Sequence, residues 1–115
     1  MVIDAHCHLS KDREPASKLI ENMDAAGVDM AVVFGGAGLR PSVDNRFVAE
    51  SAKKFPDRFI PFVYFNPRYE EAALEEVEKY VKEYGVRGVK VCHEHAVARF
   101  MYPMMEKAQE YGAVV

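Results

Sequence analysis

The sequence has few cysteines and no long apolar runs, the features that build disulfide-stapled and membrane-spanning proteins. Its 115 residues include no tryptophan and only two cysteines. Two cysteines cannot form a disulfide framework for a chain of this size, so a reducing compartment fits better. The longest apolar runs, Met30 to Phe34 and Phe59 to Phe65, are far shorter than the roughly 20 residues of a transmembrane helix. Met1 leads directly into a strand-like run without a secretory signal. We therefore expect a cytoplasmic protein that does not contact membranes.

An excess of charge of one sign is also missing. Fifteen basic and eighteen acidic residues give a net charge of -3, and both signs are interspersed along the chain. This pattern excludes an electrostatic surface for nucleic acid or anionic lipid. Half of the residues are apolar and 29% are charged, which is typical of an ordinary folded domain. Residues 1–115 are expected to form a single domain.

Short apolar runs alternate with amphipathic stretches four times along the chain. The spacing predicts strands at 2–8, 29–34, 59–65 and 86–92, and helices at about 15–26, 44–55, 69–84 and 100–111. Gly27, Pro56, Gly85 and Gly112 mark the ends of these helices. Residues 113–115 resemble the opening of a fifth strand. The pattern is a βα repeat, which indicates an α/β fold with a parallel sheet.

Two architectures fit such a repeat: an open doubly wound sheet, or part of a TIM-type (β/α)8 barrel. A complete barrel needs about 250 residues, so 115 residues can supply only about half of one. A half-barrel leaves two sheet edges without a partner strand. Such edges favour association, so a homo-oligomer formed through the unpaired edges is expected.

Two histidines at the end of the first strand are the strongest candidates for chemistry. His6 and His8 are two residues apart, so a regular strand places both imidazoles on one face, where they could hold one divalent metal ion. Asp4 lies two residues earlier and is a candidate for orienting a ring through its second nitrogen. The alternative interpretation is two polar residues at a strand end. Ile3, Ala5 and Cys7 would form the opposite, helix-packed face, with Cys7 a small core residue.

Lys90 and His93 are candidate substrate contacts. Lys90 alternates with Val89 and Val91, which predicts that its side chain points away from the helices, toward a substrate anion or, if carbamylated, toward two metal ions. An ion-paired lysine in a polar cavity is the alternative. His93 and the nearby His95 follow the same strand, and we interpret them as loop or substrate-contact residues.

Three further features have a structural interpretation. Asn66 precedes Pro67 and is expected to be a turn or cap residue. Pro61 inside the third strand predicts an irregularity or an edge-like position. The Gly35 to Gly38 loop lacks the spacing and the lysine of a phosphate-binding loop.

Four stretches resemble a known family. They are Val-Ile-Asp-Ala-His-Cys-His-Leu at 2–9, the segment from Asn45 to Phe59, Val-Tyr-Phe-Asn-Pro at 63–67 and Gly-Val-Arg-Gly-Val-Lys-Val at 85–91. In order and spacing they are similar to the amidohydrolase-2 group of metal-dependent hydrolases, which also includes decarboxylases.

This resemblance implies a (β/α)8 barrel in which His6 and His8 bind a divalent metal, usually zinc. The implied function is hydrolysis of a C–N or related bond of a small molecule by metal-activated water. The alternatives are a metal-dependent decarboxylase, or a truncated half-barrel without activity that self-associates. Family members take further ligands and the acid/base group from strands five, six and eight. Because the sequence ends at Val115, the resemblance implies that the metal site within it is incomplete.

Overall fold

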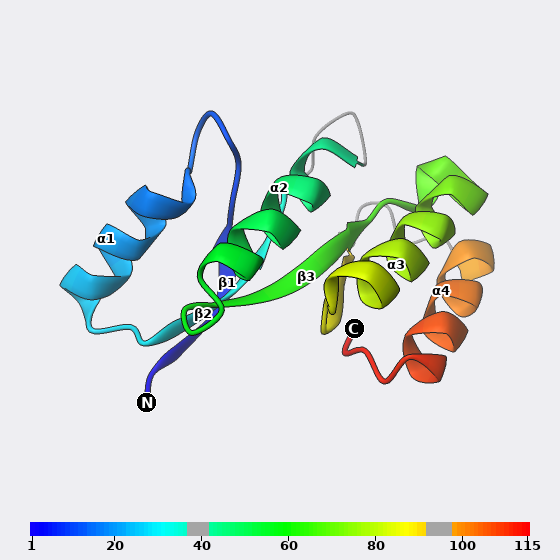
Figure 1. The fold of residues 1–115 in the computed structure, drawn as a ribbon. Coiled ribbons are helices and arrows are strands. Elements are labelled where there is room, and N and C mark those ends of the chain that lie inside the picture. The colour runs from blue at the N-terminus through cyan, green and yellow to red at the C-terminus, as the bar shows by residue number, and fades with distance from the viewer. Residues whose placement is uncertain (37–41, 92–97) are drawn as a thin grey trace.

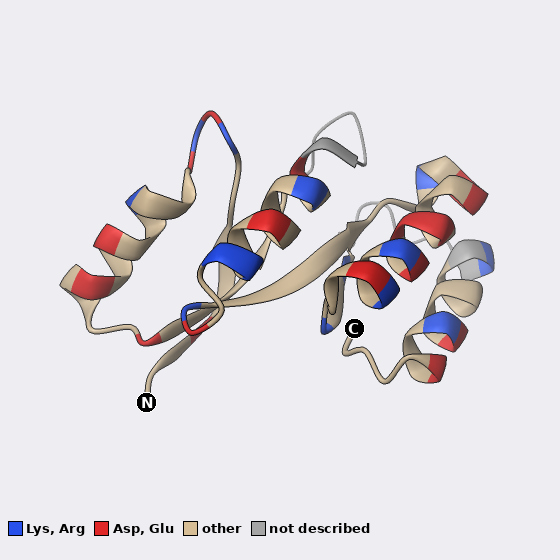
Figure 2. Ribbon diagram, in the orientation of Figure 1, with Lys and Arg blue, Asp and Glu red and all other residues tan. Residues whose placement is uncertain are grey.

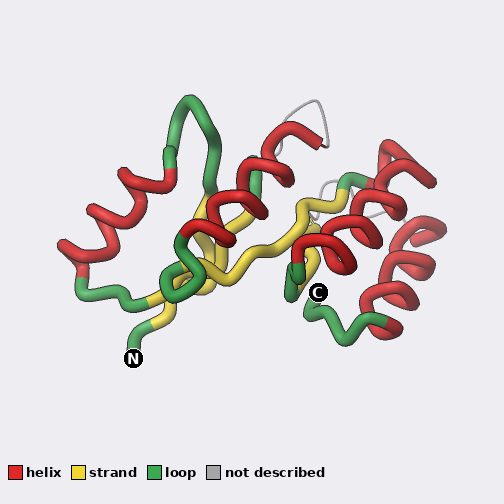
Figure 3. Tube along the Cα trace, viewed as in Figure 1, coloured by secondary structure: helices red, strands yellow, loops and turns green. Residues whose placement is uncertain are grey.

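Strands and helices alternate along the chain in the computed structural model, which describes residues 1–36, 42–91 and 98–115 (Figures 1 and 3). The strands are β1 (Ile3–His8), β2 (Met30–Phe34), β3 (Phe59–Phe65) and β4 (Gly88–Val91). The helices are α1 (Ala16–Ala26), α2 (Ser42–Lys54), α3 (Glu70–Tyr84) and α4 (Ala98–Glu110), with a short 3-10 helix, η1 (Pro67–Tyr69), before α3. The predicted βα repeat is confirmed.

The four strands form one parallel sheet in the order β1-β2-β3-β4. The chain then returns beside β4, where the backbone N–H of Val89 donates to the carbonyl of Val114 (2.7 Å) and the N–H of Val114 donates to the carbonyl of Arg87 (3.0 Å). The predicted opening of a fifth strand is therefore confirmed. Spatial order follows chain order without the reversal of a doubly wound sheet, so that alternative is wrong.

All four helices pack on the same face of the sheet. One core cluster joins α1 and α2 to Ala31 and Val33 of β2, and the other joins α3 and α4 to Phe65 of β3 and Val89 of β4. In each of these strands the residues between the core positions point to the opposite face. Helices on one face of a parallel sheet with sequential order make half of a (β/α)8 barrel. The uncovered face corresponds to the barrel interior.

Local signals in the sequence explain where the helices end. Gly27 follows α1 with φ 69° and Gly85 follows α3 with φ 66°, a left-handed conformation that glycine adopts without steric cost. Asn66 caps η1, because its side-chain oxygen accepts a hydrogen bond from the backbone N–H of Arg68 (3.1 Å). The predicted role of Asn66 as a cap residue is confirmed.

Charged side chains of both signs are spread over the helices, whereas the strands carry few of them (Figure 2). The distribution follows from the layering, since the helices cover the sheet and expose their outer surfaces to water. None of the helices in the described part of the chain is long and apolar enough to span a lipid bilayer.

The sheet opens at Pro61, as the sequence predicted. Pairing between β2 and β3 runs from Ala31 and Phe59 to Val33 and Pro61 and then stops, while β3 continues beside β4. Beyond Pro61 the buried side chain of Asn45, from α2, takes the place of the neighbouring strand. Its amide nitrogen donates to the carbonyl of Tyr64 (3.1 Å), and its oxygen accepts from the N–H of Tyr64 (2.7 Å).

The first strand departs from the expected alternation. Asp4 pairs with Ala31 but Cys7 pairs with Val33, so two residues of β1 stand opposite one residue of β2. This β-bulge changes the phase of the strand. Cys7 is buried among the helix-packed residues as predicted, whereas Ile3 and Ala5 are exposed. The expectation that Ile3 and Ala5 pack under helices is therefore wrong.

Candidate metal centre

The bulge in β1 places the two histidines at the open end of the sheet. His8 pairs with Phe34, the last residue of β2, and His6 stands within the bulge. Bulges frequently redirect a side chain next to a functional site. Here the ring centroids of His6 and His8 lie 5.3 Å apart, which brings both imidazoles to the same region of the uncovered face.

The two imidazoles share one aromatic neighbour. The ring of Phe34 lies 4.9 Å from that of His6 and 4.7 Å from that of His8, in edge-to-face arrangements with interplanar angles of 85° and 81°. Each of the three rings therefore contacts the other two. Edge-to-face geometry is the favoured arrangement for aromatic pairs. The triangle restricts the orientation of both imidazoles.

A backbone carbonyl fixes the second nitrogen of His8. Its Nδ1 lies 3.2 Å from the carbonyl oxygen of Gly35. A carbonyl only accepts, so this hydrogen bond requires the proton on Nδ1, which in the neutral imidazole leaves the lone pair on Nε2. This is the usual way in which a metal-binding histidine is held in the required tautomer. Gly35 itself is closely packed, because an added Cβ would overlap Cβ of Asp44 in α2.

Asp4 does not orient either ring in this structure. Because of the bulge it is in phase with Cys7 rather than with the histidines, and its Oδ1 accepts from the backbone N–H of His6 (2.9 Å). That hydrogen bond, together with one from the Cys7 thiol, lowers the pKa of Asp4. Burial and the Asp4 carboxylate raise the pKa of the Cys7 thiol to about 11, so this thiol stays protonated at neutral pH.

A cavity of about 300 Å³ lies next to the histidines on the uncovered face. Its lining combines His6 and the ammonium-bearing Lys90 with apolar side chains that include Val32, Phe34 and Phe62. The Nζ of Lys90 sits 5.0 Å from the ring centroid of Phe34, a cation–π contact. Lys90 thus points to the uncovered face, in the direction that the alternation of β4 predicts. The cavity lining joins the His6 imidazole, one cation and an apolar wall, and His8 contacts the lining residues His6 and Phe34.

Residues 3–115 match the model of the amidohydrolase family. The chain belongs to the amidohydrolase family. The match covers nearly the whole chain and agrees with the resemblance seen in the sequence. A search of curated proteins gave no match.

Solved structures of enzymes share the fold of this amidohydrolase-family chain. One is 4-oxalomesaconate hydratase from Rhodopseudomonas palustris, with 22% identity, a TM-score of 0.73, and coverage of 98% of this chain and 50% of the hydratase. Another is 5-carboxyvanillate decarboxylase from Novosphingobium aromaticivorans, with 24% identity, a TM-score of 0.70, and coverage of 84% and 33%; it contains manganese and 3-methoxy-4-hydroxy-5-nitrobenzoic acid. A third is 2,6-dihydroxybenzoate decarboxylase from Rhizobium, with 16% identity, a TM-score of 0.61, and coverage of 97% and 47%.

The amidohydrolase-family chain spans a third to a half of the length of these structures. At such identities the likeness concerns the fold, and the chain covers only part of their barrels. It confirms the half-barrel predicted from the sequence.

The donor atoms in the amidohydrolase-family chain are of a chemical type that binds divalent metal ions. Two adjacent imidazoles, one of them with Nε2 freed by the hydrogen bond to Gly35, are suitable ligands. They do not suffice in number, because catalytic metal sites of the zinc type take three protein ligands. Within residues 1–36, 42–91 and 98–115, no group of three or more His, Cys, Asp or Glu side chains could hold an ion. The pair can supply two ligands of a larger set.

Two predicted groups cannot be placed. His93, the second candidate for substrate contact, lies outside the described residues, as do His95 and Cys92. Ala37 and Gly38 of the glycine-rich loop are also outside them.

Phe34 and Asn45 are the important residues that the sequence did not single out. Phe34 belongs to an apolar run and is expected to be an ordinary core residue. Asn45 stands in an amphipathic helix, where an amide side chain normally faces water. One signal was present for Asn45, since it opens one of the stretches that resemble the family.

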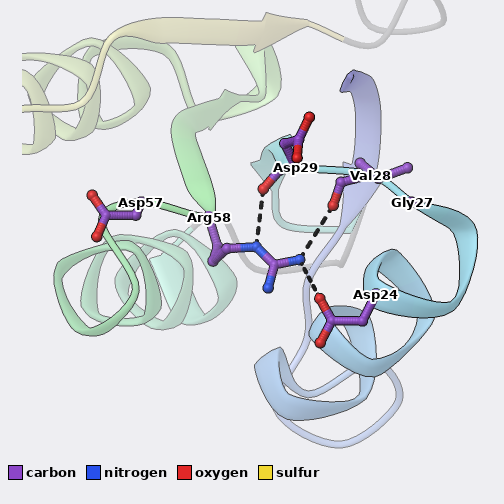
Figure 4. Close-up of a pocket in the computed structure, with 6 residues that line it drawn as sticks. All are labelled: Asp24, Gly27, Val28, Asp29, Asp57 and Arg58. Atoms are coloured by element: carbon purple, nitrogen blue, oxygen red, sulfur yellow. Dashed lines mark hydrogen bonds and ion pairs between the residues drawn. The ribbon is translucent and has the colours of Figure 1, made fainter. Parts of the chain in front are cut away.

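A second cavity lies at the opposite end of the sheet, and its centre is a structural clamp. Arg58 precedes β3, and its Nε donates to the carbonyl of Asp29 (2.9 Å) while its Nη2 donates to the carbonyl of Val28 (3.2 Å) and pairs with Asp24 (2.7 Å) (Figure 4). The guanidinium thus ties the end of α1 to the segment that enters β2. In barrels this end is associated with stability rather than catalysis.

Replacing Arg58 with alanine is expected to lower the free energy of unfolding by about 1–2 kcal/mol, because two backbone carbonyls lose a charged donor. The matched control is Arg46→Ala, which removes an exposed arginine whose side chain pairs with Glu50 one helical turn away. Urea denaturation compares the two variants. Equal shifts of the unfolding midpoint would argue against a clamp at Arg58.

Proposed function

We propose that this chain supplies the first two metal ligands and a carboxylate-binding lysine to a metal-dependent site that acts on a small aromatic acid. The observation that carries the proposal is the convergence of His6, His8 and Lys90 around one buried ring, beside a cavity. The decarboxylases with the same fold bind substituted benzoic acids, which supports this substrate class. Because the chain spans half or less of those proteins, activity is proposed for the completed site.

Each group in the cavity has a distinct task in this proposal. His6 and His8 hold a divalent cation, which when bound polarises a substrate oxygen or activates water. The Lys90 ammonium attracts and orients the carboxylate of the acid. Val32 and Phe62 supply apolar surface for an aromatic ring and exclude water from it. His93 is retained as a second substrate contact.

Decarboxylation of an aromatic acid, or hydration of an unsaturated acid, is the favoured reaction type. The site combines a carboxylate-binding cation with an apolar wall, and the enzymes of the same fold include decarboxylases and a hydratase. Hydrolysis of a C–N bond by metal-activated water is the second candidate, since the family whose model matches is described as amidohydrolase. Both reactions use the same pair of histidines. Manganese, present in one of the decarboxylases, and zinc are both candidate metals.

The test is metal-dependent binding of an aromatic acid. Two imidazole ligands bind a metal ion weakly, so equilibrium dialysis at saturating Mn²⁺ should approach one ion per chain, and 2,6-dihydroxybenzoate should bind only after metal is added. Lys90→Met should weaken binding of the acid at least about tenfold, because a charged hydrogen bond contributes about 1.5 kcal/mol or more. The control is Lys79→Met, on the exposed surface of α3. Metal-independent binding, or equal affinities of the two variants, would contradict the proposal.

We also propose that the open sheet edges mediate self-association. Val2 and Ile3, at the start of the β1 edge, and Val114 and Val115, at the other edge, are exposed apolar residues beside backbone groups that can accept another strand. Light scattering coupled to gel filtration should detect a dimer or larger species. Ile3→Lys should shift the population toward monomer, whereas Ala25→Lys on the exposed surface of α1 should not. A wild-type protein that stays monomeric at high concentration would exclude this association.

A further inference from the structure

Phe34 is buried but belongs to neither hydrophobic core. Only 2% of its surface is exposed, yet the two core clusters, which lie on the helix-covered face, do not include it. It stands at the end of β2 and points to the uncovered face. A large buried aromatic side chain outside both core clusters packs against a different set of neighbours.

Those neighbours are the polar groups of the proposed site. The Phe34 ring contacts the imidazole of His6, the imidazole of His8 and the ammonium of Lys90, at 4.9, 4.7 and 5.0 Å. The three groups come from two strands, β1 and β4, that are not adjacent in the sheet. Phe34 is thus a common contact between the candidate metal ligands and the candidate substrate contact.

Gly35, the residue after Phe34, also contacts His8. The carbonyl of Gly35 accepts from Nδ1 of His8, so the end of β2 contacts this imidazole through both the Phe34 ring and the next peptide group. The ring limits rotation of the imidazole, and the carbonyl selects its tautomer. Close packing of Gly35 against Asp44 of α2 fixes the position of this carbonyl. Ligand orientation at β1 therefore depends on where β2 ends.

We infer that Phe34 is a positioning residue that aligns His6 and His8 for a shared divalent cation and holds Lys90 beside them. The inference rests on the proposed metal site and adds the residue that arranges it. Without the ring, the imidazoles can rotate independently, and the site has to order them when the ion binds. Loss of a hydrogen-bonded partner that orients a metal ligand typically weakens metal binding by about 10-fold to 100-fold, and we expect the lower end of that range for an aromatic contact.

The experiment compares Phe34→Leu with Phe65→Leu. Phe65 is an equally buried ring on the neighbouring strand β3, but it belongs to the helix-side core and is not among the ring contacts of the histidines. Mn²⁺ is titrated into each protein, and paramagnetic broadening of the histidine ring signals gives the affinity at the pair. Phe34→Leu should bind Mn²⁺ about tenfold more weakly than wild type, and Phe65→Leu should bind as wild type does.

Two more variants keep the test decisive. Phe34→Tyr retains the ring and should restore most of the affinity. Phe34→Met retains most of the volume without the ring, and it takes the place of Phe34→Leu if that protein does not fold. Wild-type affinity in Phe34→Leu or Phe34→Met, or an equal loss in Phe65→Leu, would overturn the inference.

Spectra of the metal-free protein separate this inference from the proposed function. Wild-type His8 should show a single Nδ1-protonated tautomer in ¹⁵N spectra of the neutral imidazole. The ring-lacking variant should show a mixture of tautomers, because its imidazole is free to rotate away from the Gly35 carbonyl. If wild type shows no Mn²⁺ broadening at His6 and His8, the metal site fails, and the tautomer comparison still decides whether Phe34 orients the ring. An unchanged tautomer in the variant would contradict the positioning role.

Discussion

Replacing both His6 and His8 with alanine is expected to abolish uptake of Mn²⁺ or Zn²⁺ and to leave the fold intact. Both side chains are exposed on β1, and their ring contacts are to each other and to Phe34 rather than to the helix-side cores. Removing them therefore takes away ligands without opening a cavity in either core. Equilibrium dialysis at saturating metal, read out by elemental analysis, should show the bound metal falling from about one ion per chain to background. Circular dichroism and the urea midpoint should stay close to wild type.

The other two histidines of the chain provide a matched comparison. A His93→Ala/His95→Ala variant removes the same number of imidazoles and leaves the pair on β1 in place. It should retain uptake of one ion per chain. Full uptake by the His6→Ala/His8→Ala variant, or uptake lost only in the comparison variant, would place the ligands elsewhere.

Asn45→Ala is expected to lower the free energy of unfolding by about 2–5 kcal/mol, because two buried backbone groups would lose their partner and each unsatisfied group costs about 1–3 kcal/mol. Asn45 is 2% exposed and satisfies both the N–H and the carbonyl of Tyr64 where β2 and β3 separate. A domain is typically stable by only about 5–15 kcal/mol, so the loss is a large fraction of the total. Urea or thermal unfolding should show it as a lower midpoint.

Asn22→Ala is the control for Asn45→Ala. Asn22 is an exposed asparagine on α1, and alanine has the higher helix propensity, so stability should stay constant or rise slightly. If both asparagine variants unfolded at the wild-type midpoint, the amide of Asn45 would not be holding β3, and the separation of β2 from β3 would need another explanation.

Much of the fold was predictable because local chemistry marks the element boundaries. Gly27 and Gly85 stop helices in a left-handed conformation, and Asn66 caps η1 ahead of Pro67. Each signal acts within a few residues, so it can be read from the sequence. Pro61 also marked the place where β2 and β3 part. Strand order was left open, because it depends on long-range pairing rather than on local spacing.

The candidate site was predictable only in part. His6, His8 and Lys90 were identified because their spacing in strands sets the direction of their side chains. The bulge in β1 was not predictable from an alternating segment, and it is the reason that Asp4 lies apart from the rings it was expected to orient. The contacts of Phe34 and Asn45 were also hidden, since they join segments that are far apart in the chain.

The most direct test of the central claim is a crystal structure of the Mn²⁺-loaded protein with anomalous diffraction data. The account predicts one anomalous peak at coordination distance from an imidazole nitrogen of both His6 and His8, with Nε2 as the ligand atom of His8. Ordered manganese at any other site, or manganese bound to only one of these two histidines, would contradict it.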